Sequence, residues 1–391
     1  MGSVSNSKDQ FIDEALANRR DQHRFRTLRS LDPQGTTVVS DGEKELINFS
    51  GNDYLGLSKH PDVIDRAKQY ADKYGAGSTA SRLISGTYSI HKKLEQKLAD
   101  TFGWEGSLVF NSGFQANSTI ISTLADRHAL ILADKLSHNS LLQGSLSSRA
   151  TFRRFEHNSL EDLEDQLAHA SKEDFSRIIV ITESLFSMDG DRSNLEAIAE
   201  CTESHNAWLF VDDAHAVGVW GKNGLGLAHG IEGIDMVLGT CGKAFGGFGA
   251  FLLCSDKVKD YLINFCPGFI YTTALPPAVI GTIEAAAELI PDMDGAREQI
   301  RENIEMMKTG IHDAGFETGN SDSQIIPILV GGEQETLDLA DYLEEQGFLA
   351  TAIRPPTVPK GSARIRITLS SEHSASQIET FVRALKDWSN G

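Results

Sequence analysis

Short apolar runs alternate with amphipathic stretches between about residues 90 and 260, and this alternation constrains the fold more than any other feature. Stretches such as IHKKLEQKLADTF and SLEDLEDQLAHA have helical spacing and separate the runs. Nearly continuous apolar runs of this length are typical of strands that are buried on both faces. The pattern therefore predicts an α/β fold whose central sheet is mostly parallel and covered by helices on both faces. The runs are SLVF (107–110), ALILAD (129–134), RIIVITES (177–184), AWLFVDD (207–213), DMVLGT (235–240) and AFLLCS (250–255).

Both ends of the chain lack this alternation. Residues 9–30 predict a charged amphipathic helix that lies on the surface as an N-terminal arm. Towards the C-terminus, helices are expected over about 294–314, 335–347 and 374–388, with strand-like runs between them, which is typical of an α+β domain. We therefore predict three parts, namely an arm over 1–48, a large domain over 49–290 and a small C-terminal domain over 291–391.

The charge of the chain excludes two classes of partner. It has 36 Lys and Arg against 55 Asp and Glu, a formal net charge of −19. A chain this acidic repels phosphate backbones and anionic lipid, so neither nucleic acid nor a membrane is expected. No apolar stretch approaches the ~20 residues that span a bilayer, and the first residues lack the apolar core of a signal peptide. The four cysteines have no metal-binding spacing, so we expect a cytoplasmic protein with reduced thiols and no metal.

Two predicted strands end in residues with reactive side chains. AWLFV is followed by Asp212 and, three residues later, His215, whereas MVLG is followed by Thr240 and Lys243 before a glycine-rich turn. Ligands of open α/β sheets bind beyond the carboxyl ends of the strands, so these four side chains are expected in one cleft. They suit pyridoxal phosphate (PLP), because a lysine binds its aldehyde covalently and a carboxylate pairs with its pyridine nitrogen.

Taken singly, each of these signals has a plainer explanation. A lysine between a strand and glycines is usually a solvated loop residue, and an aspartate at a strand end often caps a helix. The glycine-rich turn alone is a weak indication of phosphate binding. The conjunction of both strand ends in a chain with a parallel sheet is what favours a PLP site.

Longer stretches of the sequence resemble the α-oxoamine synthases, PLP enzymes of fold type I that condense an amino acid with an acyl thioester and release CO2. These stretches run from about residue 12 to the C-terminus. The resemblance implies a PLP-dependent transferase fold with a large and a small domain, the cofactor pyridoxal 5'-phosphate, and a homodimer with shared active sites. The stretches are NFSGNDYLGLS (48–58), FNSGFQAN (110–117), KLSHNSLLQG (135–144), TESLFSMDGD (182–191), VDDAHAVGVWG (211–221), TCGKAFGGFGAF (240–251), YTTALPP (271–277) and AIRPPTVPKGSARIRITL (352–369).

Carried onto single residues, the resemblance implies a catalytic set around the cofactor ring. Lys243 would bind the cofactor covalently and then act as the base at the substrate Cα. Asp212 would pair with the ring nitrogen, and His138 would lie flat against the ring. His215 and Ser187 would form hydrogen bonds to the 3-oxygen of the ring.

The cofactor phosphate is expected at a strand-to-helix turn. Gly113 and Phe114 occupy such a turn in NSGFQAN, where free N–H groups and the helix dipole attract an anion. A plain tight turn is the alternative explanation. The resemblance adds the hydroxyl of Thr240 to this phosphate site and implies that Glu183 lies near the ring.

The substrates are expected to meet residues from both ends of the chain. A guanidinium can grip the substrate carboxylate, but strand alternation places Arg364 and Arg366 on the same face, so spacing does not choose between them. The resemblance favours Arg366, with Asn52 assisting, and implies that Arg26 and Thr357 lie near the acyl substrate. For Arg26, a solvated helix arginine is the alternative.

Three functions remain open. RPPTVP and DDAHAVG resemble the branch that condenses L-alanine with a pimeloyl thioester, giving 8-amino-7-oxononanoate, CO2 and a free thiol in biotin biosynthesis. The thioester carrier is either coenzyme A (CoA) or acyl carrier protein. A glycine-using relative is the alternative, of the 2-amino-3-oxobutyrate CoA ligase, 5-aminolevulinate synthase or serine palmitoyltransferase type. A non-catalytic PLP-binding regulator would need a DNA-binding domain or the loss of Lys243, and the sequence shows neither.

Overall fold

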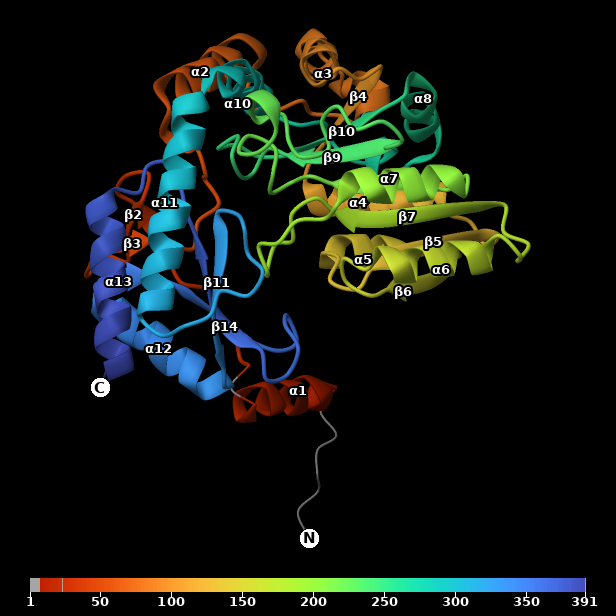
Figure 1. The fold of residues 1–391 in the computed structure, drawn as a ribbon. Helices are drawn as coiled ribbons and strands as arrows, with labels where there is room; N and C mark the ends of the chain where they lie inside the picture. Colours follow the sequence, from red (N-terminus) through yellow and green to blue (C-terminus); the bar gives the residue numbers. More distant parts are fainter. Residues whose placement is uncertain (1–7, 23, 391) are drawn as a thin grey trace.

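The computed structural model describes residues 8–22 and 24–390, and a seven-stranded sheet forms its centre (Figure 1). Strands β6, β5, β7, β8 and β9 are parallel, whereas β10 is antiparallel to both of its neighbours, β9 and β4. The prediction of a mostly parallel sheet is confirmed. In order across the sheet, the strands are β4 (Gly106–Phe110), β10 (Ala250–Cys254), β9 (Met236–Thr240), β8 (Trp208–Asp212), β7 (Arg177–Glu183), β5 (Ala129–Asp134) and β6 (Thr151–Phe155).

The direction of β10 follows from the length of its connection. Residues 241–249 join β9 to β10. A parallel strand needs a crossover of about a dozen residues or more, usually a helix, so this shorter segment makes the chain reverse direction. The same segment contains Lys243 and the glycine-rich turn.

Both faces of the sheet are buried, and successive residues of one strand enter different cores. In β5, Leu130 and Leu132 belong to one apolar cluster, whereas Ile131 and Ala133 belong to the other. This alternation explains why the strands read as continuous apolar runs. One face packs against α4 (Gly113–Leu124), α5 (Asn139–Ser147) and α8 (Asp256–Phe265), and the other against α3 (Ser89–Phe102), α6 (Leu160–Ala170) and α7 (Leu195–Ser204).

A second group of elements lies beside the sheet (Figure 1). Its three-stranded antiparallel sheet consists of β11 (Ile325–Gly331), β14 (Ala363–Thr368) and β13 (Thr351–Ile353). The three helices predicted in this region are confirmed. They are α11 (Asp294–Asp313), α12 (Glu333–Glu345) and α13 (Ala375–Asn390). Apart from the N-terminal α1, the remaining α-helices of the described residues are α2 (Pro61–Tyr74), α9 (Pro267–Ile270) and α10 (Pro277–Leu289). No helix of the described residues is long and apolar enough to cross a membrane.

The segment before residue 49 differs from the predicted helical arm. Helix α1 covers only Gln10–Asp21 and buries no side chain, so the prediction of a helix over 9–30 is wrong beyond residue 21. Residues 24–31 have no regular secondary structure, and Arg24 and Arg29 form ion pairs with residues of α12 and of the 41–44 turn. Residues 1–7 and 23 of the predicted arm lie outside the described residues.

The rest of this segment is built into the second group of elements. Strands β1 (Asp32–Pro33), β2 (Val38–Ser40) and β3 (Glu45–Asn48) form a sheet with β12 (Phe348–Leu349), in which β3 and β12 are parallel. Figure 1 shows the red strands β2 and β3 among the blue C-terminal elements. The predicted domain limits at 48/49 and 290/291 stay a prediction.

Candidate active site

A cavity of about 170 Å³ lies at the carboxyl ends of β8 and β9. Strand topology explains its position, because neighbouring parallel strands end at the same edge of a sheet. A mostly apolar hollow of about 310 Å³ lies near the amino ends of β7 and β8, and its lining contains no carboxylate or histidine. The smaller cavity is therefore the candidate site. Eight of the predicted residues line it: Gly113, Phe114, His138, Glu183, Asp212, His215, Thr240 and Lys243.

The electrostatic environment of Lys243 favours a reactive amine. The residue is half-buried, three positions beyond the end of β9. Burial lowers the pKa of Lys243 to about 8, although the charges of Asp212 and Glu183 oppose this shift. A lysine with a lowered pKa supplies a neutral amine near physiological pH, as a nucleophile or a proton acceptor requires.

Asp212 is held by hydrogen bonds at the floor of the cavity. Its Oδ2 accepts a bond of 2.7 Å from Asn117 Nδ2, and its Oδ1 accepts one of 3.0 Å from the Ala214 N–H. Asp213, the next residue, instead points to the 226–228 turn and accepts bonds from Leu227 N and Ala228 N. The two aspartates of the DDAH motif therefore have different surroundings, and only the first lines the cavity.

Asn117 and Glu183 add to the site beyond the strand-end motifs. The amide of Asn117 links Asp212 to Ser140 Oγ, at 2.7 and 2.9 Å. Burial raises the pKa of Glu183 well above its usual value, and the charge of Asp212 raises it further. Asn117 lies within FNSGFQAN but is not a predicted site residue, because nothing in the local sequence indicates a bond to a strand end 95 residues away.

His138 stands at the N-terminus of α5, on the wall of the cavity. Its backbone N–H donates to Glu183 Oε1. Its ring Nδ1 lies 2.7 Å from Ser140 Oγ and accepts a bond from the Ser140 N–H. The contacts with Ser140 thus set the orientation of the His138 ring, and the bond to Glu183 at the end of β7 sets the position of its backbone.

His215, which also lines the cavity, contacts Tyr54 from the N-terminal part of the chain. His215 Nδ1 lies 2.7 Å from the hydroxyl of Tyr54, which donates a bond of 3.2 Å to Asn52 Oδ1. Burial lowers the pKa of His215 well below its usual value, and the charges of Lys243 and Arg366 act in the same direction. Tyr54 was missed as a site residue, and its place in NFSGNDYLGLS was the signal that could have found it.

The structure distinguishes the two arginines of β14. Arg364 forms an ion pair of 2.6 Å with Asp189. Arg366 is buried, donates from Nε to the Ser187 carbonyl at 2.6 Å and contacts Tyr54. Within the part of the chain that the structure describes, Arg366 has no carboxylate partner, so its charge is available to a ligand.

Residues 113 and 114 open α4, and Ser112 caps this helix by accepting a bond from Gln115 N. The N–H groups of Gly113 and Phe114 have no hydrogen-bond partner among the described residues. A Cβ atom on Gly113 would lie 3.8 Å from Thr240 Oγ1, which places this hydroxyl beside the helix start. Free N–H groups at a helix N-terminus with a hydroxyl alongside suit an anion.

Two predicted substrate residues meet each other away from the cavity. Arg26 Nη2 donates a bond of 3.4 Å to Thr357 Oγ1, and both residues are exposed. Neither of them lines the cavity. Asn52, Ser187 and Arg366 also lie outside its lining but connect to it through Tyr54 and His215.

The chain is similar to known proteins in sequence and in fold. Residues 44–385 match the model of the family described as aminotransferase class I and II. The 8-amino-7-oxononanoate synthase of Sodalis glossinidius is 44% identical over 377 residues, which cover 96% of each chain. A serine palmitoyltransferase variant from S. paucimobilis with bound PLP and myriocin has a TM-score of 0.90 and 30% identity, covering 97% of each chain. The 8-amino-7-oxononanoate synthase from Francisella tularensis has a TM-score of 0.76 and 29% identity, covering 88% of this chain and 97% of its own.

Proposed function

The chain belongs to the aminotransferase class I and II family, and we propose that it is a PLP-dependent acyltransferase that condenses L-alanine with a pimeloyl thioester. The products are 8-amino-7-oxononanoate, CO2 and the free thiol, in biotin biosynthesis. The observation that carries the proposal is the cavity lined by Lys243, Asp212, His138 and His215. The chain that contains it is 44% identical to the 8-amino-7-oxononanoate synthase of Sodalis glossinidius.

The residues present fit PLP by the chemistry of their donor groups. Asp212 offers a buried carboxylate for a protonated ring nitrogen, and His138 offers a flat ring at the wall. The unpartnered N–H groups of Gly113 and Phe114 offer a phosphate site on the helix side. Lys243 offers an amine with a lowered pKa. Bound PLP supplies an electron-withdrawing ring that stabilises negative charge on the substrate Cα.

The chain's own groups then have distinct tasks. Arg366 binds the carboxylate of the amino acid and holds it until CO2 leaves, because its guanidinium has no carboxylate among the described residues to neutralise it. Lys243 accepts the proton from Cα. Asp212 keeps a proton on the ring nitrogen, because its carboxylate is fixed by Asn117 and Ala214. These are the roles of a carbon–carbon bond-forming decarboxylase.

Serine palmitoyltransferase is a second candidate, because the structure is more similar to that enzyme, with a TM-score of 0.90 against 0.76. Sequence identity is higher for the first candidate in the Sodalis glossinidius enzyme, at 44% against 30%, whereas the Francisella tularensis enzyme of the same name is 29% identical. Sequence identity counts the side chains that two proteins share over the whole chain, whereas the TM-score compares only their backbones, and the choice of substrate depends on side chains. We therefore place the oxononanoate reaction first.

The test is a matrix of substrates. Alanine, glycine and serine are each combined with pimeloyl-, acetyl-, succinyl- and palmitoyl-CoA and with pimeloyl-acyl carrier protein, and CO2 release and product mass are measured. One methyl group in a tight pocket shifts preference by about 10–200-fold, so the true pair should stand out. Faster turnover of glycine with acetyl- or succinyl-CoA, or of serine with palmitoyl-CoA, would refute the alanine reaction and leave the family assignment intact.

We further propose that the enzyme acts in the cytoplasm as a homodimer with shared active sites. Exposed aromatic side chains support the dimer, because Phe114, Phe248 and Tyr271 are 51, 55 and 84% exposed in the single chain, and Phe114 also lines the cavity. Analytical ultracentrifugation of the purified protein tests it, and a monomer at micromolar concentration would refute it.

A further inference from the structure

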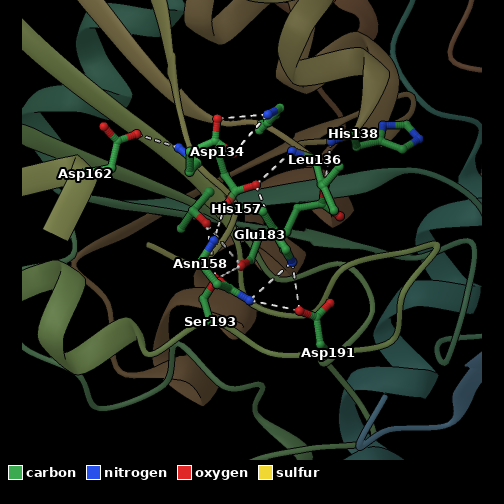
Figure 2. Close-up of polar contacts among 12 residues, drawn as sticks. Asp134, Leu136, His138, His157, Asn158, Asp162, Glu183, Asp191 and Ser193 are labelled. Atoms are coloured by element: carbon green, nitrogen blue, oxygen red, sulfur yellow. Dashed lines mark hydrogen bonds and ion pairs between the residues drawn. The ribbon is translucent and has the colours of Figure 1, made fainter. Parts of the chain in front are cut away.

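His157 bridges two buried aspartates, Asp134 and Asp191, as Figure 2 shows. Its Nδ1 lies 2.9 Å from Asp134 Oδ1, and its Nε2 lies 2.8 Å from Asp191 Oδ2. Ionised carboxylates only accept hydrogen bonds, so both ring nitrogens must carry a proton and the imidazole is cationic. Burial lowers the pKa of His157, but the hydrogen bonds to the two aspartates outweigh burial and raise this pKa to about 10.

Asp134 connects His157 to the loop that carries His138. This aspartate ends β5, and its Oδ1 also accepts a bond of 2.8 Å from the Leu136 N–H. Its backbone carbonyl accepts a bond from the Ser137 N–H. The next residue is His138, at the cavity wall. A displacement of the Asp134 carboxylate therefore moves the chain directly before His138.

Asp191 connects His157 to the loop that carries Ser187. This loop runs from the end of β7 to residue 193, and the Phe186 N–H donates to the Asp191 carbonyl across its base. The ring of Phe186 packs edge-on against His157, with centroids 4.4 Å apart. At the tip, the Ser187 carbonyl accepts the bond from Arg366 Nε. Asp191 thus fixes the base of the loop that positions Arg366.

Asn158 joins the two loops a second time. It has a left-handed backbone conformation with φ of 51°, and its N–H donates to Asp134 Oδ2. Its side-chain amide donates to Asp191 Oδ2, and its Oδ1 accepts from Ser193 Oγ (Figure 2). Ser193 in turn donates to the Glu183 carbonyl, at the end of β7. The residues around His157 therefore contact Glu183, which lines the cavity, but do not line the cavity themselves.

We propose that His157 is a positioning residue, whose cationic imidazole sets the place of His138 through Asp134 and the place of Arg366 through Asp191. A glutamine cannot replace this histidine. When its amide nitrogen donates to one carboxylate, its amide oxygen faces the other carboxylate, and two acceptors cannot form a hydrogen bond. The proposal rests on the PLP site proposed above, and it assigns a function to a residue far from the strand-end motifs. His157 itself does not line the cavity.

The test separates the contact of His157 with Asp134 from its contact with Asp191. The variants are His157→Gln, Asp134→Asn and Asp191→Asn, and His169→Gln on the exposed face of α6 is the matched control. Two quantities are measured in each variant, namely the dissociation constant of PLP from absorbance titration of the apoprotein, and KM and kcat with saturating PLP. Thermal melting of the apoprotein reports stability separately.

We expect Asp134→Asn to weaken PLP binding more than it raises the amino-acid KM, and Asp191→Asn to do the reverse. His157→Gln should affect both and lower kcat/KM by about 10²-fold, the loss that a small misplacement of reacting groups causes. The double variant His157→Gln with Asp191→Asn should recover kcat/KM about tenfold relative to His157→Gln alone. In this variant the glutamine nitrogen can donate to Asp134, and the asparagine nitrogen can donate to the glutamine oxygen. The control should change nothing.

Two results would overturn the proposal. The first is that all three variants stay within about twofold of the wild type, the range of ordinary surface substitutions. The second is that melting temperature falls while PLP binding and KM change in equal proportion in both aspartate variants. If His157→Gln does not fold, the two aspartate variants still test the proposal, because Asp134→Asn should mainly weaken PLP binding and Asp191→Asn should mainly raise the amino-acid KM. PLP binding is measured without substrate, so a wrong substrate assignment would leave that half of the test intact.

Discussion

Replacing Arg366 with methionine tests the assignment of the substrate carboxylate. Methionine keeps most of the volume of the side chain and removes its charge. Arg364 stands two residues earlier on the same strand and is the matched control, because both side chains are buried. The two differ in one respect, which is that Asp189 neutralises Arg364.

The size of the effect follows from burial. Arg366 is 8% exposed, and its donors reach a carbonyl oxygen and a tyrosine. Breaking a buried ion pair by removing one partner costs about 3–5 kcal/mol. Since no carboxylate of the described residues pairs with Arg366, this cost falls on ligand binding, and alanine should bind about 10²- to 4 × 10³-fold more weakly.

The stability of the apoprotein should change in the opposite sense. Burial lowers the pKa of Arg366, which reflects the cost of a buried cation. Arg366→Met removes that cost and should leave the melting temperature equal or higher. Arg364→Met should instead lower it, because Asp189 loses its partner.

The assay is a titration of each holoenzyme with L-alanine, followed by the absorbance of the bound cofactor, together with thermal melting of each apoprotein. Normal alanine binding by Arg366→Met, with loss of binding in Arg364→Met, would refute the assignment. Equal losses in both variants would show that the strand as a whole, and not one guanidinium, determines binding.

Three further results are expected. Borohydride reduction of the holoenzyme followed by peptide mapping should label Lys243, and Lys243→Ala should lose the label and turnover while remaining folded; label on another lysine would contradict this. Asp212→Asn should keep the cofactor but slow exchange of the alanine α-proton into deuterated water by about 10²–10⁴-fold, measured by NMR, because an amide cannot hold the ring proton. Exchange at the wild-type rate would remove Asp212 from the site. His157 should stabilise the fold most below its unfolded pKa of about 6.5 and lose this effect as pH rises through about 10, because its pKa is raised in the folded state. Melting of the wild type and of His157→Gln should therefore converge from pH 7 to pH 10, and a constant difference would contradict the cationic bridge.

Much of the large domain could be predicted because its strands are buried on both faces. That burial makes them uniformly apolar, and the direction of the sheet then brings Asp212 and Lys243 to one edge. The motifs at the ends of neighbouring strands therefore indicate one common site. The direction of β10 depends instead on the length of the 241–249 connection.

Other features depend on contacts between distant segments, which a local pattern does not contain. The choice of Arg366 over Arg364 depends on Asp189, and the orientation of Asp212 depends on Asn117. Helix α1 stops at Asp21 although the charge pattern continues, because Arg24 pairs with Glu333, 309 residues away. Such pairs are formed by tertiary structure and overrule local helix propensity.

The pairing of β3 with β12 sets an order of events during protein synthesis. Ile47 and Asn48 find their strand partners at Phe348 and Leu349, about 300 residues later. At about 5–20 residues per second, the ribosome needs about 15–60 s to supply that partner. During this time the seven-stranded sheet, which ends at Cys254, can already form, while the edge of β3 waits unpaired. The nascent chain thus carries an open strand near its N-terminus until synthesis is almost finished, and a chaperone that shields this segment would act in that interval.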